Sequence, residues 1–302
     1  RKVVPLKEAV CIPGAKIEKS SKLHILVTTK KQLEAILSSE VAFSRLYLDC
    51  DLCGNQEEWL FLLDHLRQQF HREAKSVEII IAMPHVLRKR DNLFLNNFLP
   101  VLKDADGCLF RNLETLGYLQ EQHYDKALCS DAGIYIWNLQ SFAFWEKKIT
   151  SFCLPYELNR KEQIPLLQGS ISCEQVVYGY LPMMVTANCV VKTSVGCRYP
   201  QKQGDAVFTE QYHLKDRYQK NFPVFVNCKH CYNVIYNTVP LSLHSKVSKG
   251  KKETDYRLDF TQETTQETIE ILEYFSGIMS GNMVMIPPYK EYTTGHEKRG
   301  VE

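Results

Sequence analysis

The chain has 302 residues, of which 44% are apolar and 24% are charged, so it can bury one large core or two medium ones. No run of about 18 apolar residues occurs, which excludes a membrane-spanning helix; with no apolar export signal near the N-terminus, we expect a cytoplasmic protein. The formal charge of +2 neither requires nor excludes a nucleic-acid partner. Residues 1–22 begin without Met, and we expect them to be a leader or linker in a piece of a longer protein.

From residue 23 onward, short β-branched segments alternate with amphipathic helical segments. Residues 24–29, 45–49 and 77–83 are predicted strands, and the helical stretch that begins near Glu57 carries an apolar stripe at helical spacing. The same pattern predicts further strands at 107–112, 126–129, 133–137, 149–158 and 175–185, and helices at 93–102 and 140–148.

This alternation predicts an α/β fold, a TIM-like (β/α) barrel that is closed or nearly closed. An open doubly wound sheet would alternate in the same way, but it would normally carry a Gly-rich phosphate loop after its first strand, and none follows residues 24–29. The alternation stops after Val185. We therefore expect residues 23–186 to form the barrel core, and residues 187–302 to be a cysteine-rich segment and a C-terminal helix that complete the same domain.

The eleven cysteines, in a chain without an export signal, favour a reducing compartment with metal or thiol chemistry over a disulfide scaffold. Cys228 and Cys231 form a C-x-x-C pair, whose two thiolates can bind one metal with little strain. Cys189 and Cys197 can complete a tetrahedral set, which predicts a four-cysteine metal site. The residues alone leave zinc, an iron–sulfur cluster and four ordinary reduced thiols open.

Polar side chains follow several predicted strands, where apolar packing would be expected. The reactive face of a βα barrel lies at the carboxyl ends of its strands, so we expect these side chains to line a pocket under the cysteine-rich segment. They are Asp49, Asp51, Arg111, Asn112, Asn138, Glu157 and Asn159.

The C-terminal tail adds His296 and Arg299, which either belong to a disordered terminus or return over the barrel mouth to bind an anionic ligand. The sequence shows no Ser-His-Asp order, no nucleophile elbow and no H-E-x-x-H motif, so hydrolysis has no visible machinery.

Five segments, in this order along the chain, resemble the collagenase-like peptidase family (peptidase U-32), and most of all the C-terminal half of its long members. The resemblance runs from about residue 22 to the end of the sequence. One departure concerns the family's cysteine block: Cys189 is present but the earlier cysteine is missing, and Cys231 stands in as the fourth ligand. The segments are residues 155–159, 177–184, 214–217, 222–231 and 294–296.

This resemblance implies a barrel-like domain of an iron–sulfur-dependent, RNA-modifying enzyme of the hydroxylase type, in a family where some members use prephenate as co-substrate. It implies a 4Fe–4S cluster, with zinc as the alternative, and two partners: RNA and an N-terminal half outside this chain. A collagenase-like peptidase and a non-catalytic accessory barrel with a structural zinc are the alternative functions. The implied ligands are Cys189, Cys197, Cys228 and Cys231, and our candidates for catalysis are Asp49, Arg111, Glu157, Asn159 and His296.

Overall fold

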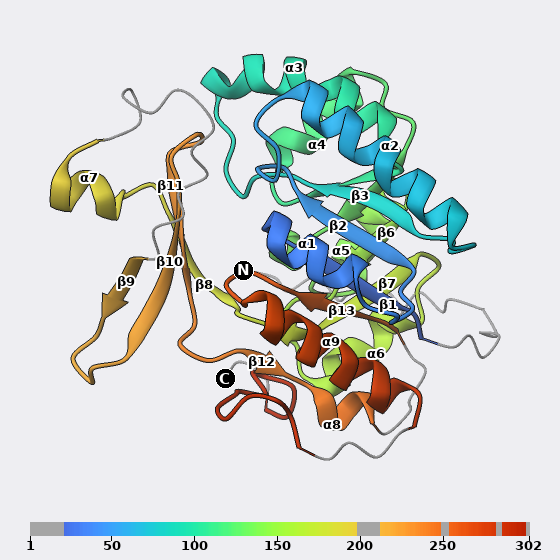
Figure 1. The fold of residues 1–302 in the computed structure, drawn as a ribbon, viewed down its shortest axis with the longest axis vertical. Helices are drawn as coiled ribbons and strands as arrows, with labels where there is room; N and C mark the ends of the chain where they lie inside the picture. Colours follow the sequence, from blue (N-terminus) through green and yellow to red (C-terminus); the bar gives the residue numbers. More distant parts are fainter. Residues whose placement is uncertain (1–20, 198–211, 249–253, 282–285, 300–302) are drawn as a thin grey trace, which may run out of the picture.

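A computed structural model describes residues 21–197, 212–248, 254–281 and 286–299 (Figure 1). The predicted leader thus lies almost wholly outside the described residues. None of the described helices is both long and apolar enough to cross a membrane.

Eight parallel strands close into a barrel, which confirms the predicted TIM-like fold. Each strand pairs with the next along the chain, and the last strand pairs with the first, with Leu23 opposite Tyr256. In order around the barrel they are β1 (Leu23–Val27), β2 (Arg45–Asp49), β3 (Glu78–Ala82), β4 (Gly107–Phe110), β5 (Ala127–Ser130), β6 (Ser151–Cys153), β7 (Ser172–Gly179) and β13 (Asp255–Asp259).

Helices follow the barrel strands and surround them (Figure 1). Seven of these helices have an Asn, Asp or Thr at the N-cap, and in six of them its side chain accepts a backbone N–H of the first turn. The helices are α1 (Lys30–Leu37), α2 (Gln56–Arg72), α3 (Asn92–Asp104), α4 (Leu113–Glu121), α5 (Leu139–Trp145), α6 (Arg160–Leu167) and α9 (Thr265–Met279), with the shorter η1 (Lys89–Asp91), η2 (Ala132–Ile134) and α8 (His244–Val247).

A second, antiparallel sheet is inserted between β7 and β13, and we call it the inserted sheet. It stands beside the end of the barrel at which the parallel strands finish (Figure 1). Its strands, in spatial order, are β8 (Pro182–Thr186), β11 (Tyr232–Tyr236), β10 (Asn221–Asn227) and β9 (Tyr212–Lys215), with α7 (Val190–Val195) following β8.

The insertion explains where the predicted elements differ from the structure. The predicted strand 175–185 is two strands in different sheets, and the eighth barrel strand, β13, lies outside the expected core of residues 23–186. The predicted strand 133–137 is wrong, because η2 occupies its start and Tyr135 takes a left-handed backbone with φ of 56°. The predicted strand 149–158 shortens to β6, with Pro155 beyond its end.

The barrel has a seam between β6 and β7, because β6 pairs only with the first residues of β7. Farther along β7, the short strand β12 (Leu241–Ser242) pairs with Gly179 and Tyr178. The C-terminal tail extends this pairing: the backbone N–H of Ser242 donates to the Thr293 carbonyl at 2.8 Å. We call residues 293–297 the seam strap.

Glu297 fixes the seam strap to the barrel. Its carboxylate accepts hydrogen bonds from Lys246 Nζ at 2.9 Å, Gln163 Nε2 at 3.2 Å and Gln175 Nε2 at 3.3 Å. The Glu297 and Lys246 side chains are only 14% and 11% exposed, so solvent screens this ion pair weakly.

Replacing Glu297 with Ala should lower the free energy of unfolding by about 2 kcal/mol, because Lys246 and two amides lose their buried partner. Thermal denaturation followed by circular dichroism measures the change. Glu291→Ala, at an exposed position of the same tail, is the control and should leave the melting temperature unchanged. Equal melting temperatures for the two variants would contradict a structural role of the seam strap.

Candidate active site

The middle of the barrel is filled by side chains and is not a pore. Six inward-facing residues form a separate buried cluster there, and all are at most 2% exposed. Because such filling leaves no passage through the barrel, a ligand can only enter at one of its ends. The six are Leu26, Tyr47, Ile80, Ala82, Leu109 and Cys129.

Arg257 of β13 lies inside the barrel with no exposed surface. Its guanidinium donates to Glu174 at 2.6 Å, to Asp131 at 2.7 Å and to Asp259 at 2.7 Å. A buried guanidinium is tolerated only when carboxylates compensate its charge, and three do so here. Glu174 also accepts hydrogen bonds from Tyr47 at 2.8 Å.

Arg111, directly after β4, continues this chain of charges at the barrel mouth. It donates to Asp131 at 3.0 Å and to Asp49 at 3.1 Å. We call this row of alternating acidic and basic side chains the mouth network. It consists of Asp49, Arg111, Asp131, Arg257 and Asp259. Its two ends are the parts a ligand can reach, because Asp49 and Asp259 are 15% and 14% exposed whereas Arg257 is fully buried.

The carboxyl groups of the mouth network differ in pKa. Burial raises the pKa of Asp259 to about 6, against the opposing effect of Arg257. Burial also acts on Asp131, but the Arg257 and Arg111 guanidiniums outweigh it and hold the Asp131 pKa well below its usual range. Acid–base catalysis commonly uses two neighbouring acids whose pKa values differ. One acid is then ionised, and the other can exchange a proton near neutral pH.

A third buried carboxyl, Glu263, lies just beyond β13. It accepts hydrogen bonds from the Tyr178 hydroxyl at 3.0 Å and from the Thr261 backbone N–H at 2.6 Å. Burial raises the pKa of Glu263 to about 7 despite these hydrogen bonds. The barrel mouth therefore holds two carboxyl groups, Asp259 and Glu263, that can change protonation close to neutral pH.

The inserted sheet covers part of the barrel mouth. Tyr236 of β11 is close enough to Arg111, Asp49 and Asp259 for their charges to act on its hydroxyl, and burial raises the Tyr236 pKa above its ordinary value. Asn227 of β10 donates to Asp51 at 2.6 Å. The mouth is thus bounded by residues from two different sheets.

The predicted site residues divide into two groups. Asp49, the last residue of β2, and Arg111, directly after β4, meet in the mouth network. By contrast, Asn159 caps α6 by accepting the backbone N–H groups of Lys161 and Glu162, which is a structural role. Asn112 and Asn138 cap α4 and α5 in the same way.

The remaining candidates lie in the loop after β6 and in the C-terminal tail. Glu157 accepts a hydrogen bond from the Tyr135 hydroxyl at 3.3 Å. His296 and Arg299 are exposed, His296 in the seam strap and Arg299 just after it. Sequence reasoning missed Arg257 and Asp259, although charged residues at alternate positions of a short strand point to the same face.

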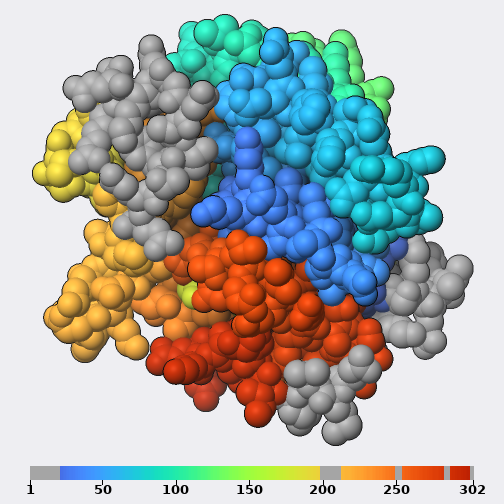
Figure 2. Space-filling view, in the orientation of Figure 1, coloured from blue at the N-terminus to red at the C-terminus, as the bar shows by residue number. Residues whose placement is uncertain are grey.

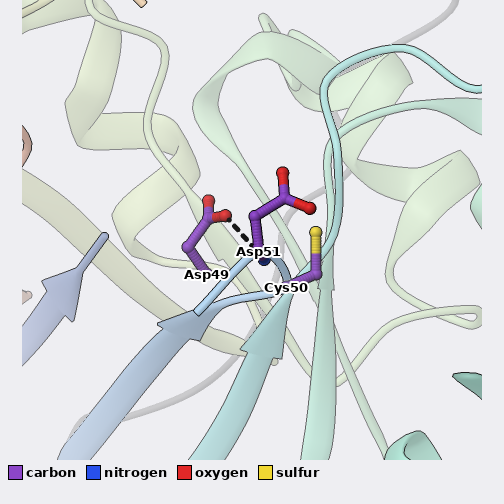
Figure 3. Close-up of side chains that lie close together, drawn as sticks. All are labelled: Asp49, Cys50 and Asp51. Atoms are coloured by element: carbon purple, nitrogen blue, oxygen red, sulfur yellow. Dashed lines mark hydrogen bonds between the residues drawn. The ribbon is translucent and has the colours of Figure 1, made fainter. Parts of the chain in front are cut away.

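One group of three possible metal ligands occurs in the described part of the chain: Asp49, Cys50 and Asp51 (Figure 3). The backbone N–H of Asp51 donates to the Asp49 carboxylate at 3.2 Å, and Asp49 is also paired with Arg111. Burial raises the pKa of the Cys50 thiol well above its ordinary value, which opposes the thiolate that a metal needs. These residues could hold a metal only weakly.

The four predicted metal ligands are all in or next to the inserted sheet. Cys189 and Cys228 pack against the same valine cluster, formed by α7 and β10. Cys231 is exposed, with a left-handed φ of 51°, and Cys197 is exposed beyond the end of α7. The structure does not bring three of these sulfurs within 4.8 Å of one another, so the four-cysteine site stays a prediction.

The chain matches no family model and no curated protein. Among solved structures it is similar to an uncharacterized B. cereus protein, at 12% identity and a TM-score of 0.42 over 85% of this chain; it spans only 65% of that protein. It is also similar to the C-terminal domain of a putative chitinase from Desulfitobacterium hafniense DCB-2, at 7% identity and a TM-score of 0.41, covering 86% of this chain and 99% of that one. Similarities this low support no functional inference.

The raised pKa of Glu263 predicts a pH-dependent stability. Between its ordinary value of 4.5 and its folded value of about 7, the folded protein binds a proton that the unfolded chain releases. The contribution of Glu263 to the free energy of unfolding therefore falls as the pH rises through this window. Relative to Glu263→Gln, which cannot ionise, the wild type should lose on the order of 3 kcal/mol across it.

Urea denaturation of both proteins at several pH values measures this difference. Glu40→Gln, at an exposed position, should keep the pH dependence of the wild type. If Glu263→Gln also kept it, the buried carboxyl would not have the raised pKa assigned to it.

Proposed function

We propose that the chain is the catalytic barrel of an iron–sulfur-dependent, RNA-modifying enzyme of the hydroxylase type, with its active site at the barrel mouth. The observation that carries the proposal is the mouth network, a set of buried charges whose partly exposed ends include a carboxyl with a pKa of about 6. Acidic side chains with a shifted pKa at the carboxyl ends of barrel strands are typical of catalytic sites. The family resemblance of the sequence supplies the reaction class.

The position of the C-x-x-C hairpin supports the proposal. Lys229, between the two cysteines, pairs with Asp51 at 3.4 Å. Arg88, in the loop after β3, donates to the backbone carbonyls of His230 and Cys231. The hairpin is thereby tied to the loops that follow β2 and β3, next to the barrel mouth, where a redox centre would have to lie in order to act on a substrate held there.

The chain's own residues can perform the acid–base part of such a reaction. Asp259 can give or take a proton at its carboxylate oxygen, while Arg257 holds it in place. The Tyr236 hydroxyl stays protonated and can donate a hydrogen bond to a keto oxygen. A bound cluster would supply electron transfer, and Cys228 and Cys231 beside the mouth would be among the residues that hold it.

The peptidase alternative lacks an activated thiol at Cys50 and Cys153, two cysteines at the carboxyl ends of barrel strands. Burial raises the pKa of Cys50 and Cys153 well above the ordinary thiol value, so both thiols stay protonated and unreactive. His85, a histidine near the mouth, has its pKa lowered to about 3 by burial. It lies beside Tyr232 and donates its backbone N–H to the Tyr232 hydroxyl, and no described contact pairs it with a serine or cysteine.

Asp259→Asn should reduce RNA modification by about 100-fold or more, because it removes the proton-exchanging carboxyl and keeps its shape. The readout is mass spectrometry of nucleosides from cells that express the protein, in search of a nucleoside that gains one oxygen atom. Glu40→Gln, at an exposed position before β2, is the control and should keep full modification. Unchanged nucleosides in cells that express the wild type, or digestion of gelatin by the purified protein, would contradict the proposal.

Anaerobic purification tests the cluster. The wild type should be brown, with broad visible absorption and bound iron and sulfide, and Cys228→Ser/Cys231→Ser should lose both metal and colour. Cys173→Ser changes a buried barrel thiol and should keep them. A colourless protein with bound zinc would instead support the accessory barrel with a structural metal, and a protein without metal would contradict both.

A further inference from the structure

The inserted sheet differs from the rest of the chain in its charge. Residues 182–197 and 212–236 contain five lysine and arginine residues and a single acidic residue, Asp216, giving a formal charge of +4 against +2 for the whole sequence. The Asp216 carboxylate is used within the β9–β10 turn, where it accepts the backbone N–H groups of Tyr218 and Lys220. The described surface of this sheet is therefore strongly basic.

The two faces of the inserted sheet have different neighbours. Val224 and Val226 of β10 pack against Val191 of α7, so this face is covered. Side chains alternate along a strand, so Phe225 and Asn227 point to the opposite face. Asn227 contacts Asp51 at the barrel mouth, and we call this opposite face the mouth-side face.

The mouth-side face carries basic and aromatic groups that water can reach. Strand register places His213 opposite Pro223 and Lys215 opposite Asn221, on the same face as Phe225. His213 and Lys215 are exposed, and Phe225 is 38% exposed. The face thus extends from the barrel mouth to the outer edge of the sheet.

The β9–β10 turn continues this surface at its outer end. Tyr218 is 68% exposed, and the Arg217 guanidinium lies 4.7 Å from the centre of its ring. Lys220, after the same turn, is also exposed. In Figure 2, where residues are coloured along the sequence, the light-orange strands of this sheet project from the body of the molecule.

We propose that the mouth-side face and the β9–β10 turn form a track on which single-stranded RNA reaches the barrel mouth. Lys215, Arg217 and Lys220 bind phosphates, and bases stack on the rings of Phe225 and Tyr218. The inference rests on the RNA-modifying function proposed above and adds the surface that binds the substrate.

Charge and shape favour single-stranded RNA as the occupant. A polyanion is attracted to a surface with three exposed cations, Lys215, Arg217 and Lys220, and one internally bonded acid, Asp216. The exposed aromatic rings lie apart from one another among the cations. Unpaired bases of a single strand can stack on such rings, since every base offers a face for stacking. The barrel mouth itself carries Asp49, Asp131 and Asp259, so phosphates are best held outside it while one base enters.

Fluorescence anisotropy with a short labelled single-stranded RNA tests the track. Lys215→Gln/Arg217→Gln should bind about tenfold more weakly, and its plot of log Kd against log salt should be shallower by about 1.4, because two phosphate contacts are lost. Phe225→Ala should weaken binding by about tenfold with an unchanged salt slope, because it removes stacking only. Circular dichroism establishes that each variant is folded.

Lys103→Gln/Lys126→Gln makes the same change of charge at exposed positions just before β4 and β5, at the opposite end of the barrel, and should bind RNA like the wild type. Equal weakening in both double variants would overturn the track but leave RNA binding intact. A wild type that binds no RNA would overturn the proposed function as well. The same holds if it binds only vesicles of phosphatidylcholine and phosphatidylserine.

Discussion

The ion pairs of Arg257 with Glu174, Asp131 and Asp259 are the constraint on which the barrel mouth depends. A guanidinium without exposed surface is stable only if its partners stay in place, so it fixes the relative positions of β5, β7 and β13. This requirement also sets the protonation of the site. The same cation that keeps Asp131 ionised cannot fully offset the burial of Asp259, and the two acids are separated in pKa by their surroundings alone.

The inserted sheet forms one side of the site at the mouth network. Tyr236 lies close to the charges of the mouth network, and Asn227 ties the sheet to the loop after β2. Because the sheet enters the chain between β7 and β13, it reaches the barrel mouth without disturbing the barrel itself. The scaffold and the surface that meets the solvent are therefore built from separate segments, as is common in βα barrels.

The repeat of strands and helices was enough to predict the barrel, but it could not locate the eighth strand, because the inserted sheet interrupts the repeat before β13. Asp49 and Arg111 were among the polar residues expected at the strand ends, and the structure brings these two together. The sequence could not distinguish these two residues from the helix caps Asn112, Asn138 and Asn159. A helix cap and a catalytic polar residue both follow a strand in a βα unit. Arg257 and Asp259 could be predicted as site residues only if β13 were known to belong to the barrel.

The pairing of β1 with β13 has a consequence for biosynthesis. Leu23 lies opposite Tyr256, so the first strand of the barrel meets its final neighbour only after more than two hundred further residues have left the ribosome. Until then the edges of β1 and β7 that β13 will join are both open, and other chains could pair with them. Contacts this distant in sequence also make folding slow, so these edges stay open for longer.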